Sequence, residues 1–190
     1  MAISGCGASP TAIDLARTRP LGRGPAFRPP ALGNRAVAVA APVGTLRCAG
    51  RGGTRYGAHV ELFAQDRGVA VSAGIGIAPP QIRRGPFVQG GRCSYPLRTT
   101  APTGVVEVDQ RARSGTATVG ALFALWGQPL SARRLGGFDA ARGSAVLAFV
   151  DGRRWEGDPR SIPLRRHAQI VLEVGPRVEP HPAYAFPPGL

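Results

Sequence analysis

The chain has 190 residues, 43% of them hydrophobic, which is enough for one folded domain with tails. Its formal charge is +13, and all 24 basic residues are arginine. Aromatic residues make up only 6% of the chain. The arginine doublets lie in widely separated segments without interleaved aromatic residues, a pattern that favours solvated surface charge over nucleic-acid binding. The charge remains compatible with binding to an anionic lipid surface. The sequence contains no run of eighteen apolar residues, so it does not predict a transmembrane helix.

The first ten residues, MAISGCGASP, contain a match to a bacterial lipobox, ISGC, which ends at Cys6. A lipobox cysteine receives a lipid after the signal peptide is cut. Only five residues precede Cys6, too few for the charged and apolar regions of such a signal. We interpret residues 1–6 as the remnant of a lipoprotein signal peptide whose true translation start lies upstream. The alternative is that Cys6 is an ordinary cysteine.

The chain has two further cysteines, Cys48 and Cys93. If Cys6 carries a lipid, these two can pair, and closing a loop of that size would stabilise the fold by about 4 kcal/mol. In a reducing compartment the same thiols would act as small hydrophobic side chains. The two hypotheses support each other, because a lipoprotein is exported into an oxidising compartment.

Residues 7–44 mix proline, glycine, alanine and arginine without a helical or alternating period. They predict a flexible tether with one short strand at residues 36–40. Residues 59–64 and 69–73 flank a QDRG turn and predict a β-hairpin. A loop is expected from there to Cys93.

Residues 103–109 are rich in β-branched side chains and predict a strand. Residues 118–128 place apolar side chains at helical spacing, with Thr118 as N-cap and Gly127 after the last turn, and they predict one short helix. Residues 145–150 lead into Asp-Gly, a strong hairpin signal, and residues 168–175 alternate as a last strand.

The order of these elements is hairpin, strand, helix, hairpin, strand. It predicts an α+β domain at residues 45–176, in which one short helix covers a small mixed β-sheet. The order resembles the β-grasp arrangement, an analogy of shape that says little about function. Residues 177–190 are proline-rich and are expected to form an extended tail.

Motifs for catalysis are scarce. No Gly-x-Ser-x-Gly occurs, and the absence of lysine excludes a phosphate-binding GxxxxGK[ST] loop. The GIGIAP stretch lacks the spacing of a dinucleotide loop, and two prolines follow it instead of a helix. We therefore predict a protein that is not an enzyme and needs no cofactor.

On two predicted strands, a pair of titratable side chains occupies alternate positions and therefore shares one face. Glu107 and Asp109 share one strand face and could seat a metal or an acid/base pair, although the solvated face of an edge strand is the more common explanation. His59 and Glu61 pose the same choice, and two ligands do not complete a metal site. His167 is expected at a turn before the last strand, with an exposed or locally bonded imidazole. The two tryptophans are expected to be core anchors.

Several stretches together resemble an uncharacterised family of bacterial exported proteins. They are AHVELFAQDRGVAVSAGIGI (58–77), CSYPLRTTAPTGVVEVD (93–109), TVGALFALWGQPLS (118–131), FVDGRRWEGDPRSIPLRRHAQIVLEVG (149–175) and the terminal FPPGL. The family has a His-x-His-x-His-Leu string in its first strand and a Leu-His-Thr-His-Asp string later. Histidines at this spacing would suit a copper or zinc ion.

This chain has lost most of those histidines. In the first string only His59 remains, and in the second Arg98, Thr100 and Ala101 replace the two histidines and the aspartate. One imidazole beside a guanidinium offers too few ligands and a repelling charge for a divalent cation. The resemblance therefore implies a retained scaffold without the metal site.

The sequence predicts a non-enzymatic extracytoplasmic lipoprotein, a binding or structural module of unknown ligand. Membrane lipid would hold it through Cys6 at the outer face of the cytoplasmic membrane or in the periplasm, and its partner would be an unknown protein or small molecule. The alternative is a copper- or zinc-handling protein with a degenerate site of His59, Glu61 and His167.

Overall fold

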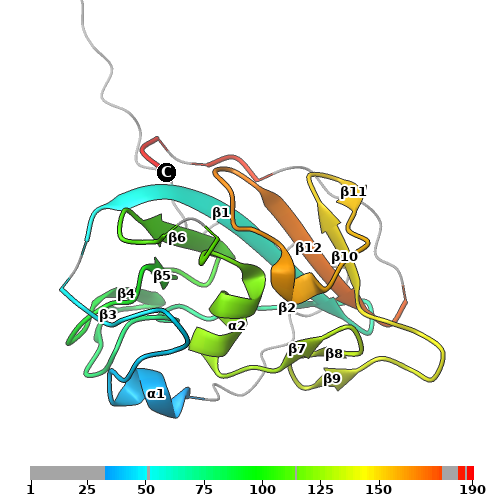
Figure 1. Ribbon diagram of the computed structural model, residues 1–190, viewed down its shortest axis with the longest axis horizontal. Helices are drawn as coiled ribbons and strands as arrows, with labels where there is room; N and C mark the ends of the chain where they lie inside the picture. Colours follow the sequence, from blue (N-terminus) through cyan, green and yellow to red (C-terminus); the bar gives the residue numbers. More distant parts are fainter. Residues whose placement is uncertain (1–32, 51, 114, 177–183, 187) are drawn as a thin grey trace, which may run out of the picture.

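The computed structural model describes residues 33–50, 52–113, 115–176, 184–186 and 188–190. Cys6 and most of the predicted tether lie outside this range. Within it, the chain forms a mixed β-sheet with few helices, as expected for a small α+β fold (Figure 1). Among the described residues, none of the helices has the length and hydrophobicity needed to span a bilayer.

The main sheet has the strand order β11-β10-β12-β1-β6-β5, and β2 also pairs with β1. Its strands are β1 (Thr54–Ala64), β2 (Arg67–Val69), β5 (Leu97–Arg98), β6 (Val105–Asp109), β10 (Leu147–Val150), β11 (Arg153–Arg154) and β12 (Gln169–Val174). The long strand β1 is parallel to β12 and antiparallel to β2 and β6. It is therefore the central strand on which the rest of the sheet is built.

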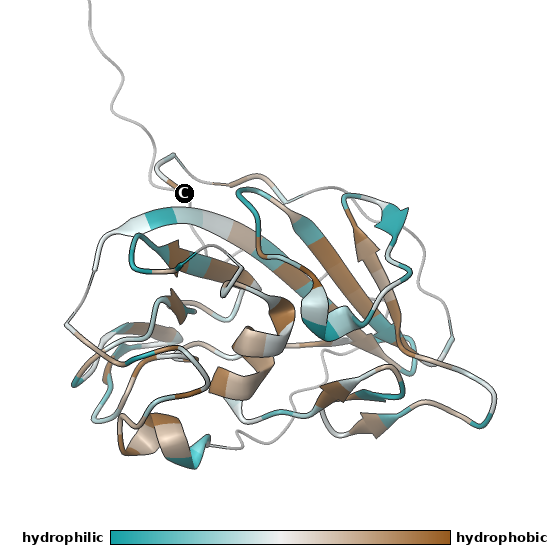
Figure 2. Cartoon of the chain, in the orientation of Figure 1, coloured by the Kyte–Doolittle hydropathy of each residue, from teal (hydrophilic) through white to brown (hydrophobic). Residues whose placement is uncertain are grey.

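The side chains of strand β1 alternate between the two faces of the sheet. Ala58, Val60 and Leu62 belong to the main hydrophobic core, whereas His59 and Glu61 point to the opposite face. The core face is covered by α2 (Val119–Trp126), which lies within the curve of the sheet (Figure 1). Hydrophobic residues dominate both α2 and β12 (Figure 2). Buried side chains of both elements belong to one hydrophobic core, whose burial stabilises the domain.

The structure confirms the predicted helix and its caps. The Thr118 side chain accepts a hydrogen bond from the backbone N–H of Ala121, at 3.1 Å. Gly127 ends the helix in the left-handed conformation, with φ of 73°. Both signals could be found in the sequence because each satisfies backbone groups at its own end of the helix.

Both predicted hairpins are present. Gln65 and Asp66 connect β1 to β2 with φ of 54° and 61°, and Asp151 and Gly152 connect β10 to β11 with φ of 51° and 76°. Positive φ at both central residues matches the right-handed twist of the flanking strands. Strand β2 ends at Val69 and is shorter than the predicted strand at residues 69–73.

The strand predicted at residues 36–40 is wrong. Residues Arg35–Ala38 form a short helix, α1. Asn34 caps it by accepting a hydrogen bond from the backbone N–H of Ala36, at 2.9 Å, and Val37 is buried. Asn34, the capping residue directly before this stretch, favours the helix because its side chain satisfies a backbone N–H of the first turn.

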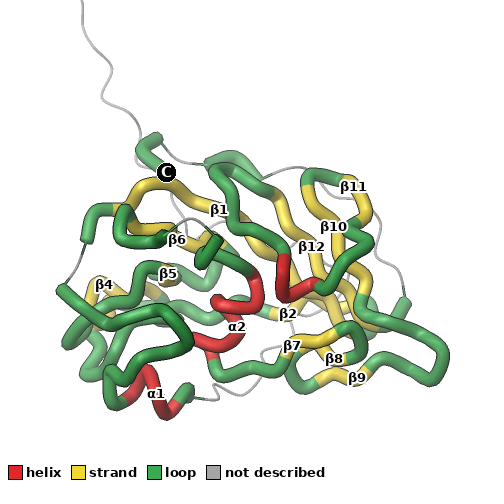
Figure 3. The backbone as a smooth tube through the Cα atoms, in the orientation of Figure 1, coloured by secondary structure: helices red, strands yellow, loops and turns green. Residues whose placement is uncertain are grey.

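Two small sheets and a single turn of 3-10 helix occur where the sequence suggested loops or turns. They are the hairpin β3 (Ile82–Arg84) and β4 (Phe87–Gly90), the three-stranded sheet of β7 (Leu130–Ser131), β8 (Arg134–Leu135) and β9 (Phe138–Asp139), and η2 (Pro159–Ser161). Their strands are only two to four residues long. Such lengths are too short for a hydrophobic period, and loops connect them at both ends of the molecule (Figure 3).

The described C-terminal residues return to the main sheet. The Gln169 side chain donates to the backbone oxygen of Tyr184 and accepts from its backbone N–H, both at 3.1 Å. Phe186 stacks on His167 with ring centroids 4.6 Å apart. A Cβ atom at Gly57 would lie 3.3 Å from Phe186, so the absence of a side chain there admits this close approach. These residues cover part of the sheet face opposite α2.

Candidate functional site

A disulfide joins Cys48 to Cys93, with their Cα atoms 5.6 Å apart. Two backbone hydrogen bonds between Ala49 and Ser94, at 3.1 and 2.9 Å, flank the disulfide. The Tyr95 hydroxyl donates to the carbonyl oxygen of Ala41 at 2.5 Å. The predicted pairing is therefore present, and it holds the α1 segment against the residues that precede β5.

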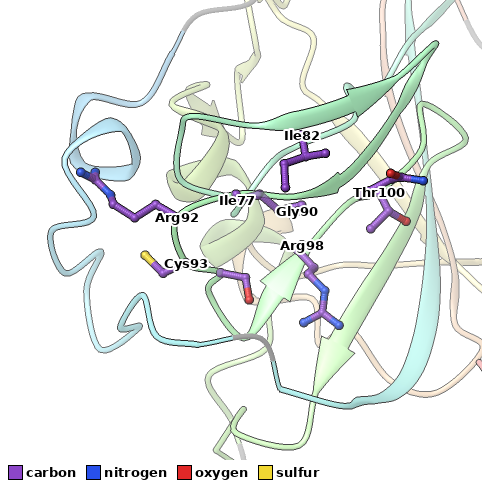
Figure 4. Close-up of a pocket in the computed structure, with 10 residues that line it drawn as sticks. Ile77, Ile82, Gly90, Arg92, Cys93, Arg98 and Thr100 are labelled. Atoms are coloured by element: carbon purple, nitrogen blue, oxygen red, sulfur yellow. The ribbon is translucent and has the colours of Figure 1, made fainter.

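A cavity of about 240 Å³ lies beside this disulfide, between the β3–β4 hairpin and the segment leading into β5 (Figure 4). Its lining consists of Ile77, Ile82, Gln89, Gly90, Gly91, Arg92, Cys93, Ser94, Arg98 and Thr100. The volume is smaller than the roughly 300–1,000 Å³ of common ligand pockets. It suits a small molecule or one side chain of a partner.

The two arginines of the cavity lining are engaged elsewhere. Arg92 extends toward α1, where its Nη2 donates to the carbonyl oxygen of Ala38 at 2.8 Å (Figure 4). The guanidinium of Arg98 points away from Ile82 and toward two carboxylates (Figure 4). With Ile77 and Ile82 in its wall, the cavity favours an uncharged and mainly apolar group.

The GIGIAP stretch has a packing role. Gly76 adopts a φ of 70°, and a Cβ atom there would lie 2.0 Å from the carbonyl oxygen of Leu97. Its backbone oxygen accepts from the backbone N–H of Tyr95 at 2.8 Å. Glycine is thus required for the close approach of this loop to β5.

Arg98 is the centre of a buried ionic cluster. Only 2% of its side chain is exposed, and its Nη1 lies 3.0 Å from Oδ2 of Asp109, which is fully buried. Its Nη2 lies 3.0 Å from Oε2 of Glu107 and donates to the Thr54 hydroxyl at 2.7 Å. Arg111 adds a second guanidinium, with Nη2 2.9 Å from Oδ2 of Asp109. Two positive and two negative charges therefore compensate one another inside the fold.

The environment of Asp109 makes its charged form the stable one. Burial by itself would raise the pKa of this carboxyl, but hydrogen bonds from Arg111 and Arg98 outweigh burial and hold the pKa below its usual value. This corrects the expectation of a solvated edge-strand face at Glu107 and Asp109. Strand β6 lies between β1 and β5, and both carboxylates are ion-paired.

His59 lies on the same sheet face and is 5% exposed. Its Nε2 is 3.0 Å from the carbonyl oxygen of Thr103, which can only accept, so Nε2 carries a hydrogen. The other ring nitrogen, Nδ1, lies 3.9 Å from Oε1 of Glu61. Tyr184 stacks on the imidazole with ring centroids 4.3 Å apart. The structure thus brings together His59 and Glu61 and adds Tyr184, which the sequence did not indicate.

Burial raises the pKa of Glu61 from 4.5 to about 7. The folded state therefore holds this proton more tightly than the unfolded chain, and its contribution to stability is fully present below pH 4.5 and lost as pH rises to about 7. We expect Glu61→Gln to remove this loss and to exceed the native protein in stability at pH 8 by about 3 kcal/mol. Urea unfolding at several pH values between 5 and 8 measures it.

A matched control for this measurement is Asp66→Asn, which removes an exposed carboxyl from the β1–β2 turn. We expect that variant to keep the native pH dependence. Equal pH profiles for Glu61→Gln and the native protein would contradict the assignment of this titration to Glu61.

The side chain of His167 has other contacts than those of His59 and Glu61. It is exposed, has a φ of 59° in the turn before β12, and its Nε2 lies 2.5 Å from the backbone oxygen of Leu190. The turn predicted for His167 is therefore confirmed. Within the described ranges, no group of three or more histidine, cysteine, aspartate or glutamate side chains is arranged to hold a metal ion. His59 and Glu61 are thus the two candidate ligands that lie together.

Comparison of the chain with protein-family models, curated proteins and solved structures gives no match.

Proposed function

We propose that this protein is a non-enzymatic binding module of the bacterial cell envelope, held at the membrane by a lipid on Cys6. The Cys48–Cys93 disulfide is the observation that carries the proposal. Disulfides of this kind persist in oxidising compartments outside the cytoplasm. With these two cysteines paired, Cys6 is the third cysteine of the chain and is available for lipidation.

The binding role is supported by the cavity between the β3–β4 hairpin and β5. Its wall combines Ile77 and Ile82 with the hydroxyl groups of Ser94 and Thr100. Of the two arginines in the lining, Arg92 donates to the backbone of Ala38 and Arg98 is compensated by its carboxylate partners. The lining residues include no activated nucleophile or base. A small uncharged ligand, or an apolar side chain of a partner protein, is the group that we expect there.

A β-grasp-like arrangement is part of this proposal. The order β2-β1-β12-β10-β11, with β1 parallel to β12, is consistent with it, and α2 follows the first hairpin in sequence. The motifs shared with the histidine-rich family of exported proteins support the same cellular location. Shape alone does not identify a ligand.

Metal handling is the second candidate. The observation in its favour is the 3.9 Å distance between Nδ1 of His59 and Oε1 of Glu61, which places one imidazole nitrogen beside one carboxylate. Both groups are ligands for zinc and copper. Further ligands would have to come from water or from a partner.

Mass spectrometry tests both candidates on protein expressed from its own gene region and extracted from the membranes of its native host. We expect an intact mass with a diacylglyceryl group on Cys6 and a deficit of two hydrogens from the disulfide. A soluble, unlipidated and fully reduced protein would contradict the first candidate. One equivalent of zinc or copper under native conditions, lost in His59→Ala, would favour the second.

A further inference from the structure

The acidic residues are distributed unevenly along the chain. The sequence has no aspartate or glutamate between Asp14 and Glu61, and none between Asp66 and Glu107. The described parts of these two stretches include α1, β3 and β4, which lie together at one end of the molecule (Figure 1). The Cys48–Cys93 disulfide and the hydrogen bond from Arg92 to Ala38 connect the two stretches.

Five exposed arginines mark this end, which we call the arginine end. They are Arg35, Arg47, Arg83, Arg84 and Arg92. Three of them donate to neutral oxygens: Arg47 to the backbone of Gly44 at 3.0 Å, Arg83 to the side chain of Gln81 at 2.5 Å, and Arg92 to the backbone of Ala38 at 2.8 Å. A hydrogen bond to a neutral oxygen leaves the positive charge of the guanidinium uncompensated.

Some exposed arginines elsewhere in the described structure have carboxylate partners, whereas Arg133 and Arg166 donate to backbone oxygens. Arg154 lies 3.3 Å from Glu156, Arg160 lies 2.6 Å from Asp158, and Arg134 lies 3.7 Å from Asp139. Two of these pairs involve residues of β8, β9 and β11, which lie away from α1 (Figure 1), and the third belongs to η2. The arginine end differs in that the two stretches that form it contain no acidic residue at all, so the charge that they carry is positive throughout.

Large apolar side chains are exposed at the same end. Val39 follows α1 and is 63% exposed, and Ile82 begins β3 and is 62% exposed. Ile82 directly precedes Arg83 and Arg84. Apolar side chains beside arginines suit the boundary between lipid headgroups and acyl chains, where both kinds of group find partners. A nucleic acid would satisfy the arginines but would leave the aliphatic side chains without an apolar environment.

We propose that the arginine end, with Val39 and Ile82, docks on an anionic lipid bilayer. The negative potential of such a surface attracts each nearby arginine, and the two aliphatic side chains enter the lipid interface. Helix α1 lies within residues 7–44, the stretch that the sequence assigns to the tether, so the lipid anchor proposed above would join the domain at the docking surface. The docking itself does not depend on a lipid at Cys6.

Vesicle binding tests this with the full chain carrying Cys6→Ser, so that a failure of the lipidation proposal leaves the result unaffected. Sedimentation with phosphatidylcholine vesicles, with and without phosphatidylglycerol, measures the partition coefficient. We expect binding only to the anionic vesicles. Arg83→Gln/Arg84→Gln should weaken it by about thirtyfold, and Ile82→Ser should weaken it further.

The matched control is Arg153→Gln/Arg154→Gln, which removes the same charge from β11 at the other end of the sheet. Because all these side chains are exposed, the variants should keep the native near-ultraviolet circular dichroism. An equal loss of binding in the two doublet variants, or tighter binding to duplex DNA than to anionic vesicles, would overturn the proposal. A loss confined to the β3 doublet and to Ile82→Ser supports it.

Discussion

Replacement of Arg98 by methionine is expected to lower the free energy of unfolding by about 3–5 kcal/mol. The guanidinium is 2% exposed and bridges Asp109 and Glu107, whose side chains are 0% and 13% exposed. Removing the guanidinium takes this partner away from Glu107. Asp109 then keeps its ion pair with Arg111. A buried carboxylate that loses its cation incurs a large desolvation penalty.

A double-mutant cycle in urea separates this penalty from the lost packing of the side chain. Arg98→Met/Glu107→Gln should recover part of the loss, because the second substitution removes the charge that the first leaves uncompensated. The control is Arg154→Met, which breaks an exposed pair with Glu156 and should cost less than about 1 kcal/mol. Equal losses for Arg98→Met and Arg154→Met, or additive effects in the cycle, would show that the cluster contributes little.

Elements with strong local signals could be predicted from the sequence. Asp151 and Gly152 form the expected turn because positive φ is a requirement of the turn itself. Thr118 and Gly127 bound α2 because they satisfy its terminal backbone groups. The strand predicted at residues 59–64 also matches β1, in which Val60 and Leu62 belong to the core.

The sheet face opposite α2 could not be predicted in the same way. Alternation distinguishes two faces of a strand, but it does not reveal that His59 lies beneath Tyr184, which is 125 residues away in the chain. Nor did spacing reveal that Arg98 neutralises Glu107 and Asp109 from the neighbouring strand. A single arginine facing two carboxylates at alternate positions is the signal that would have indicated this cluster.

The arginine end was also missed, for a related reason. Its members come from α1, the segment after it, the β3–β4 hairpin and the segment that follows the hairpin. The predicted Cys48–Cys93 pair indicated that Arg47 and Arg92 lie near each other, but α1 and the β3–β4 hairpin were expected to be tether and loop. Overall charge suggested only a compatibility with anionic lipid. The disulfide fixes the α1 segment beside residues 92–95 and thereby brings arginines from distant parts of the sequence onto one surface.

Removal of that disulfide is the second large effect that we expect. The variant Cys48→Ala/Cys93→Ala opens a loop with a sequence separation of 45 residues. On the chain-entropy model this lowers the free energy of unfolding by up to about 4 kcal/mol. Guanidinium unfolding with and without dithiothreitol measures the change, and the reductant should destabilise the native protein while leaving the variant unaffected.

The effect should also be local. Outside the disulfide, the α1 segment is held by a few contacts, among them the hydrogen bonds of Ala49 with Ser94 and of Tyr95 with Ala41. Amide hydrogen exchange in the variant should therefore rise most in residues 35–50 and 92–95, and less in β12, which is paired on both sides. A uniform rise that includes β12 would contradict this, because the disulfide would then stabilise the whole domain as one cooperative unit.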